Sequence, residues 1–318
     1  MTQRSSVSRG SFLRDSVGVA AAWELQRAAW ALGFAPGAPV CNSLAAEQEV
    51  GPYYVADELI RRDVREGKPG VPLHLRLAVL DVRSCKPLPN TAIDIWHCDA
   101  LGLYAGFTKM GAPGMGPGGP AGPLPDWDPD RPGPPPGFDA QRPSDGPRPP
   151  EGMGPPPVMH TTDQLTFLRG IQLTDDEGSV EFATIIPGFY MGRTNHIHFK
   201  VYAGGRVVSR KETPDGKTYV EGHTSHIGQV FFPEEVMAEL MSHKPYAEHQ
   251  IHRITQAEDG IFQDQHGAAS IARLRSIDSR HPEAGYIAEM IVAVDPTKTP
   301  ALVGMHGPRA PGVQHLEH

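Results

Sequence analysis

Hydrophobic and polar residues alternate along most of the chain after residue 70, which is the pattern of half-buried β-strands. Residues 71–82 show it first, with Leu73, Leu75, Leu77 and Val79 separated by less hydrophobic positions. We expect strands at residues 71–82, 91–97, 166–173, 179–186, 195–202, 205–209, 227–232 and 286–294. Short strands separated by turn residues predict a mainly β fold, an antiparallel β-sandwich with few helices.

One helix and one insertion interrupt this pattern. Residues 233–242 begin with Pro233, Glu234 and Glu235, which favour a helix N-terminus. Residues 108–160 contain more than half of the chain's 33 prolines, many glycines and almost no aliphatic side chains. Such a segment cannot bury enough apolar surface to form a core. We expect a long Pro/Gly-rich loop, either a tolerated surface insertion or, as its place between two candidate metal ligands favours, a cover over a pocket.

The expected organisation is an N-terminal helical segment at residues 1–45, a sandwich domain at 46–300 and a tail at 301–318. Residues 8–14 resemble a degenerate twin-arginine export signal, with Gly10 in place of the second arginine. The stretch after it carries Glu24, Gln26 and Arg27. Because an export signal needs an uninterrupted apolar run, a packed amphipathic helix and a cytoplasmic protein are favoured over an exported one. Residues 316–318 look like the start of an expression tag.

Charge and hydropathy argue against several classes of partner. The net charge of −8 disfavours nucleic acid or an anionic membrane surface. No run approaches 18 apolar residues, so the sequence predicts no transmembrane helix. The three cysteines lack CxxC spacing, and a Cys41–Cys85 disulfide and buried free thiols are equally open.

The most distinctive side chains lie at residues 187–198. A strand at 195–202 would direct His196 and His198 to one face, with Cα atoms about 6.6 Å apart, so that both imidazoles could meet one metal ion. Tyr190 would lie about 20 Å away if the chain stayed extended. Residues 191–194 must therefore fold back for Tyr190 to join the histidines, and Gly192 makes that turn easy.

Tyr190 changes the kind of metal that this segment would suit. A phenol has a pKa of about 10 and binds a metal well only as phenolate, which requires a hard, highly charged ion. Fe(III) meets that requirement better than Zn(II) or Mg(II). The segment is thus compatible with a ferric site, while an ordinary strand with two incidental histidines is the alternative.

Four blocks of sequence, in order, resemble one known family. They are 51–55 (GPYYV), 94–104 (DIWHCDALGLY), 167–170 (FLRG) and 187–198 (PGFYMGRTNHIH). Together they resemble the intradiol ring-cleavage dioxygenases, the protocatechuate and catechol dioxygenase family, and most closely its single-chain actinobacterial members. The similarity extends over roughly residues 41–295.

The resemblance implies a non-haem Fe(III) cofactor and a reaction. The implied iron ligands are Tyr104, Tyr190, His196 and His198. Tyr190 would leave the metal and act as a base when substrate arrives, and Arg193 would stabilise developing negative charge. Gln229 matches a polar residue near the iron. The implied reaction cleaves a catechol-type ring with O2, between its two hydroxylated carbons, to a cis,cis-muconate-type diacid.

The chain also departs from the family pattern. Val50 stands where the family commonly has Glu, and the long helical N-terminal dimerisation region of the catechol dioxygenases is absent. Both departures bear on oligomerisation, and a homodimer stays open. Phe189 and Met191 replace the more usual Pro or Trp, which makes them the first candidates for substrate contact. Three other histidines are expected to be structural, or to support the ligands from outside, rather than to bind the metal: His97, His223 and His226. A non-catalytic β-sandwich binding module and a zinc-dependent hydrolase using the His-x-His pair are the alternative functions.

Overall fold

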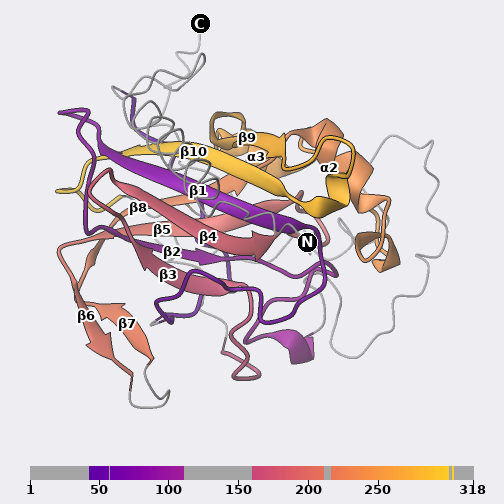
Figure 1. The fold of residues 1–318 in the computed structure, drawn as a ribbon, viewed down its shortest axis with the longest axis horizontal. Helices are drawn as coiled ribbons and strands as arrows, with labels where there is room; N and C mark the ends of the chain where they lie inside the picture. Colours follow the sequence, from indigo (N-terminus) through magenta and orange to yellow (C-terminus); the bar gives the residue numbers. More distant parts are fainter. Residues whose placement is uncertain (1–42, 57, 111–159, 211–215, 301–302, 304–318) are drawn as a thin grey trace, which may run out of the picture.

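Two four-stranded sheets lie face to face in the computed structural model of the protein (Figure 1). The structure describes residues 43–56, 58–110, 160–210, 216–300 and 303. One sheet has the order β4-β1-β10-β9 and the other β3-β2-β5-β8. Their bounds are β1 (Pro72–Asp81), β2 (Ala92–Trp96), β3 (Arg169–Leu173), β4 (Ser179–Ile185), β5 (His196–Ala203), β8 (His223–Phe231), β9 (Arg273–Ser276) and β10 (Tyr286–Val294). The expected mainly β sandwich is confirmed.

The remaining elements are short. A hairpin of β6 (Arg206–Ser209) and β7 (Lys217–Val220) extends away from the sandwich (Figure 1). The expected helix forms as α2 (Glu234–Met241), and α3 (Gly260–Asp264) follows it. Four 3-10 helices complete the described elements: η1 (Thr108–Met110), η2 (Tyr246–Glu248), η3 (Gly267–Ser270) and η4 (Pro282–Ala284). No helix among the described residues combines the length and the apolar character needed to cross a membrane.

The structure differs from the expected strands in three respects. The pairing of β1 with β10 is parallel, whereas the other strand pairs of the two sheets are antiparallel. Because about two hundred residues separate these strands, no tight hairpin turn dictates an antiparallel pairing. The sequence did not predict β7 and β9, which are only four residues long. β3 begins at Arg169 rather than residue 166, because Leu168 has a positive φ of 58° that breaks the strand.

The main core fills the space between the sheets. The alternating residues of β1 that the sequence picks out, Leu73, Leu75, Leu77 and Val79, are buried there. Ile197, Phe199 and Val201 of β5 meet them from the other sheet. Because side chains alternate along a strand, His196 and His198 must lie on the opposite, outer face of β5. The candidate site is therefore built on the back of the second sheet and not in the sandwich core.

Several expectations concern segments outside the described residues. They are the N-terminal segment through residue 42, including Cys41, most of the 108–160 insertion and nearly all of the tail. The two described ends of the insertion are joined by Asp163, whose carboxylate accepts hydrogen bonds from the backbone of Gly106 and Thr108 at 3.0 and 2.8 Å. Cys98 is a buried free thiol.

Candidate metal centre

His196 and His198 converge as the strand periodicity predicts. Their Nε2 atoms lie 3.1 Å apart, and both rings are buried. Nδ1 of His196 lies 2.7 Å from the carbonyl oxygen of Thr194, so Nδ1 carries the proton and Nε2 keeps its lone pair. Burial lowers the pKa of both imidazoles well below the usual value, and the nearby positive charge of Arg193 adds to the effect. The two histidines are neutral nitrogen donors.

Tyr190 reaches these histidines through a tight turn. The backbone N–H of Arg193 donates to the Tyr190 carbonyl at 3.0 Å, and Gly192 has a φ of +80°, a conformation that glycine adopts without strain. The Tyr190 hydroxyl oxygen then lies 3.4 Å from Nε2 of His196. The expected fold-back of residues 191–194 is confirmed.

Tyr104 approaches from the loop that follows β2. Its ring centroid lies 5.8 Å from that of Tyr190, and its hydroxyl is buried without a hydrogen-bond partner among the described residues. Arg169, the arginine of the Phe-Leu-Arg-Gly block, holds this loop by donating from Nε and Nη2 to the Ala105 carbonyl at 3.1 and 2.7 Å. The ring of Tyr53 stacks on Tyr104 with centroids 4.8 Å apart. Two of the four sequence blocks thus serve to place one phenol.

Two further residues enclose His198. The indole of Trp96 lies parallel to the imidazole, with centroids 5.0 Å apart. Gly51 approaches the same ring so closely that an added Cβ would lie 3.1 Å from Cε1 of His198. Gly51 also has a φ of +68°, which disfavours any side chain. The Gly-Pro-Tyr-Tyr block therefore packs directly against a candidate ligand, a contact that the sequence did not predict.

The four candidate donors fit a ferric ion. Within the described part of the chain, no three His, Cys, Asp or Glu side chains form a group able to hold a metal, and this cluster instead combines two imidazoles with two phenols. The unpartnered Tyr104 hydroxyl costs about 1–3 kcal/mol unless something pairs with it. Burial raises the pKa of both phenols, and only a nearby cation of high charge would favour their phenolate forms. Hard oxygen donors beside imidazole suit Fe(III).

Arg193 lies beside this cluster at the centre of a buried polar network. Its Nε lies 3.1 Å from Oδ2 of Asp259, and its Nη1 lies 3.1 Å from Oε1 of Glu49. The side-chain oxygen of Gln229 accepts from Nη2. Burial alone would lower the pKa of Arg193, but the neighbouring Tyr190, Asp259 and Glu49 outweigh it and raise the pKa. The guanidinium is permanently charged and fixed in orientation.

Gln229 owes its place to strand register. It lies opposite His198 in the β5–β8 pairing, as Trp96 does in the β2–β5 pairing, so all three share the outer face of the sheet. Its backbone N–H donates to the side-chain oxygen of Gln48 at 2.5 Å. Gln229 contacts Arg193 and places the Gly51 segment against the sheet, because Gln48 precedes that block by three residues.

Glu49 and Asp259 are site residues that the sequence did not predict. Asp259 also accepts from the backbone of Thr194 at 2.9 Å and, as the N-cap of α3, from Phe262 at 3.0 Å. An aspartate before Gly260 is a recognisable helix start, but nothing local indicates its link to Arg193. Glu49 lies next to Val50, the position noted as unusual, and Val50 packs against the cluster that contains both tyrosines. Burial raises the pKa of Glu49 against the opposing effect of Arg193.

Phe189 does not join the tyrosine pair. It lies in the main core and packs on His249 with ring centroids 5.1 Å apart, whereas Tyr190 belongs to the separate cluster with Tyr104. Met191 is half-buried in the turn. The expectation that these residues contact substrate stays a prediction, and the placement of Phe189 does not favour it.

In the described part of the chain, His97, His223 and His226 form no hydrogen bond with any of the four donors. His97 is buried, with Nδ1 2.8 Å from the Cys98 carbonyl and Nε2 2.7 Å from Oγ1 of Thr184, and burial lowers its pKa to about 4. His226 pairs with Glu47 at 2.7 Å, and His223 is exposed. These contacts are those of structural and surface residues.

The fold is found among known structures. No protein-family model and no curated protein sequence matches the chain. An intradiol ring-cleavage dioxygenase from Tetranychus urticae matches with a TM-score of 0.58 and 26% identity, covering 82% of this chain and 98% of that one. A second structure, described as a dioxygenase, has a TM-score of 0.57, 26% identity and the same coverage. This chain has the fold of the intradiol ring-cleavage dioxygenases.

The intradiol dioxygenase fold confirms the resemblance expected from the four sequence blocks, and with it the class of enzyme. The match spans nearly the whole length of both neighbours and 82% of this chain, whose described part is built on the two sheets. The cluster of Tyr104, Tyr190, His196 and His198 lies on the second of these sheets and its loops.

Proposed function

We propose that this protein is a non-haem Fe(III)-dependent intradiol dioxygenase that cleaves a catechol-type ring with O2 to a cis,cis-muconate-type diacid. The observation that carries the proposal is the convergence of two phenols and two neutral imidazoles beside a fixed guanidinium. Tyr190 lies 3.4 Å from His196, which lies 3.1 Å from His198, and Tyr104 is buried without a partner. The fold shared with intradiol ring-cleavage dioxygenases supports the same conclusion.

The four donors would hold the ferric ion. A bound ferric ion would supply the Lewis acidity and redox chemistry that allow a catechol to react with O2. His196 and His198 would contribute no charge, since burial keeps them neutral. Tyr104 and Tyr190 would contribute one negative charge each as phenolates, which neutralises part of the ferric charge.

Tyr190 is the residue that we assign to proton transfer. A catechol that binds as a dianion must give up two protons. Tyr190, as a phenolate, can accept one at its oxygen and become a neutral phenol, and a hydroxide can accept the other and leave as water. Its position on a tight turn, rather than on a strand, suits a side chain that must change its partner. Tyr104, held in a loop by Arg169 and stacked on Tyr53, suits a ligand that stays in place.

Arg193 would orient the substrate and stabilise negative charge that develops on it. Removing one such donor from an active site typically costs about 10²–10³-fold in rate. Asp259, Glu49 and Gln229 fix the guanidinium in place, so it needs little reorganisation when charge develops. These three are positioning residues, because they act through Arg193.

Oxygen consumption with a panel of catechols tests the proposal. The panel would include catechol, protocatechuate and hydroxyquinol, with the product of each reaction identified by mass. We expect one O2 consumed per ring opened and a diacid that contains both oxygen atoms. A semialdehyde product would mean cleavage outside the two hydroxylated carbons and would contradict the proposal.

A further inference from the structure

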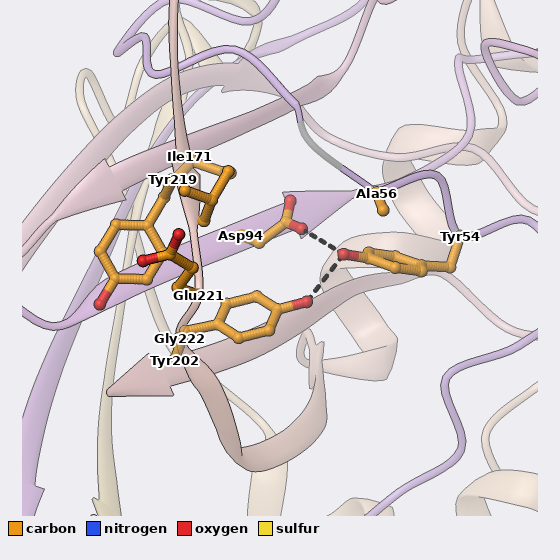
Figure 2. A pocket seen from close by; sticks show the side chains of 9 residues that line it. Tyr54, Ala56, Asp94, Ile171, Tyr202, Tyr219, Glu221 and Gly222 are labelled. Atoms are coloured by element: carbon orange, nitrogen blue, oxygen red, sulfur yellow. Dashed lines mark hydrogen bonds between the residues drawn. The ribbon is translucent and has the colours of Figure 1, made fainter. Parts of the chain in front are cut away.

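A cavity lies on the outer face of the same sheet, next to the metal centre, and Tyr54 separates the two by packing against Trp96 with ring centroids 4.8 Å apart. Its volume is about 150 Å³, and it lies between β2, β5 and the chain that links β7 to β8 (Figure 2). None of the four candidate iron ligands lines it. Its lining includes Tyr54, Ala56, Asp94, Ile171, Tyr202 and Tyr219.

Asp94 provides the polar group in this cavity. Its side chain is buried, and Oδ2 accepts a hydrogen bond from the Tyr54 hydroxyl at 3.1 Å. The Tyr54 hydroxyl also lies 2.7 Å from that of Tyr202 (Figure 2). Oδ1 of Asp94 is buried and has no partner among the described residues. An unpaired buried acceptor is costly, and a ligand that hydrogen-bonds to Oδ1 would remove that cost.

Apart from Glu221, the other walls are aromatic or apolar. The rings of Tyr54, Tyr202 and Tyr219 and the side chain of Ile171 surround the space (Figure 2). The rings of Tyr202 and Tyr219 lie 6.4 Å apart at 44°, and both line the cavity, so a third ring placed there would contact them. A protein cavity of about 150 Å³ is large enough for one benzene-sized ring. Size and lining together favour a single-ring aromatic ligand.

Charge favours a neutral ligand over an organic cation. The ammonium group of Lys200 already lies 3.3 Å from the ring centroid of Tyr54, close to Asp94. Glu221, the other carboxylate of the lining, is paired with Arg206 at 2.6 Å. A cationic ligand would therefore be repelled by the charge of Lys200. Asp94 would be the one carboxylate of the described lining left to balance it. A hydroxyl group can donate or accept, so it pairs with Asp94 in either protonation state.

We propose that this cavity binds a small neutral phenol, with the ring between the tyrosines and the hydroxyl on Oδ1 of Asp94, at a site separate from the metal centre. The inference does not rest on the proposed catalytic function. It requires only the cavity, its aromatic walls and the unpartnered carboxylate oxygen.

Calorimetric titration of the purified, metal-loaded protein with phenol tests this site. Ala56→Phe fills the cavity from an exposed position without removing any member of the polar network, and Ala56→Leu fills it less. Val207→Phe is the matched control, because Val207 is exposed on β6 and does not line the cavity. We expect phenol binding to the unmodified protein and to Val207→Phe, a weaker affinity in Ala56→Leu, and loss of this binding step in Ala56→Phe.

A second ligand and the visible spectrum distinguish phenol binding in this cavity from non-specific binding and from binding at the metal. Toluene has nearly the shape of phenol but no hydroxyl, and it should bind at least about tenfold more weakly because Oδ1 stays unpaired. Phenol that binds at the metal would change the visible spectrum, whereas phenol in this cavity should not. Phenol affinities that are equal in the unmodified protein, Ala56→Leu and Ala56→Phe would overturn the proposal, as would equal affinities for toluene and phenol. If the protein carries no iron, the effect of Ala56→Phe on phenol affinity still shows whether phenol binds in this cavity.

Discussion

Asp259 and Arg193 form an ion pair inside the protein, with Oδ2 3.1 Å from Nε and the aspartate fully buried. The same carboxylate accepts from the backbone of Thr194 and caps α3. One side chain therefore links the guanidinium, the turn that carries Tyr190 and a helix from a distant part of the chain.

Asp259→Asn should both destabilise the protein and slow its reaction. The amide can still cap α3, but it removes one of the two carboxylates that balance Arg193. Loss of one partner of a buried pair costs about 3 kcal/mol. We expect a lower melting temperature and a lower kcat with unchanged iron content. Asp295→Asn is the control, because the Asp295 carboxylate accepts from Thr297 in a turn after β10 and, among the described residues, forms no hydrogen bond or ion pair with Arg193 or the candidate ligands. Equal kcat values in the two variants would show that Asp259 does not position Arg193.

Arg193→Ala should lower kcat by about 10²–10³-fold. It should also destabilise the protein, because Glu49 and Asp259 lose their shared counter-charge. The double variant Arg193→Ala/Glu49→Gln removes one of those carboxylates. Urea unfolding should find the double variant more stable than the single one, while stopped-flow rates stay equally low. Recovery of rate along with stability would mean that Arg193 serves the fold alone.

The sequence predicts the sandwich, the shared face of the two histidines and the turn after Tyr190, because each follows from strand period or from one glycine. It does not predict the partners of Arg193. Glu49 lies 144 residues away in the chain and Asp259 lies 66 away, so only the packed fold brings them together. Strand register likewise decides that Trp96 and Gln229 lie beside His198.

The resemblance to a family, rather than any local pattern, brings Tyr104 into the candidate site. Nothing in the residues around it marks a metal ligand, and its hydroxyl becomes conspicuous only in the structure, where it is buried and unpartnered. For Phe189, by contrast, the sequence suggests a role in the site that the structure does not favour. Its place next to Tyr190 in sequence suggests a pocket residue, but side chains of adjacent residues diverge, and it packs in the core.

Tyr190→Phe should change the colour of the iron-loaded protein and slow turnover. A phenylalanine cannot bind the metal or accept a proton, so one tyrosinate charge-transfer contribution disappears. Visible absorption and steady-state rates measure the two effects. Tyr246→Phe is the control, because Tyr246 is equally buried but donates to the Ile186 carbonyl away from the cluster. An unchanged spectrum and rate in Tyr190→Phe would remove this residue from the ligand set.

Asp94 should make stability depend on pH. Burial, with Glu58 adding to it, raises the pKa of Asp94 to about 8 in the folded protein, against about 3.9 in an unfolded chain. The folded state therefore binds this proton more tightly than the unfolded state does. The stability that the protonated Asp94 carboxyl contributes is fully present below about pH 4 and is lost as the pH rises through about 8. The side chain in Asp94→Asn stays neutral. The melting temperature of this variant minus that of the unmodified protein should therefore increase as the pH rises from about 5 to about 9.

The matched control for this pH dependence is Asp63→Asn. Asp63 is held by Arg65, which lowers the pKa of Asp63 to about 2, so it stays ionised over the whole range tested. Its difference in melting temperature from the unmodified protein should be flat between about pH 5 and about pH 9. A flat difference for Asp94→Asn as well would show that Asp94 is ionised in the folded protein at neutral pH.

Metal content and visible absorption of the purified protein test the central claim most directly. Two tyrosinates on one ferric ion predict about one equivalent of iron per chain and a red-brown colour from charge transfer. A colourless protein that carries zinc, or one that binds no iron after incubation with a ferric salt, would contradict the account. Zinc would point instead to a hydrolase that uses His196 and His198.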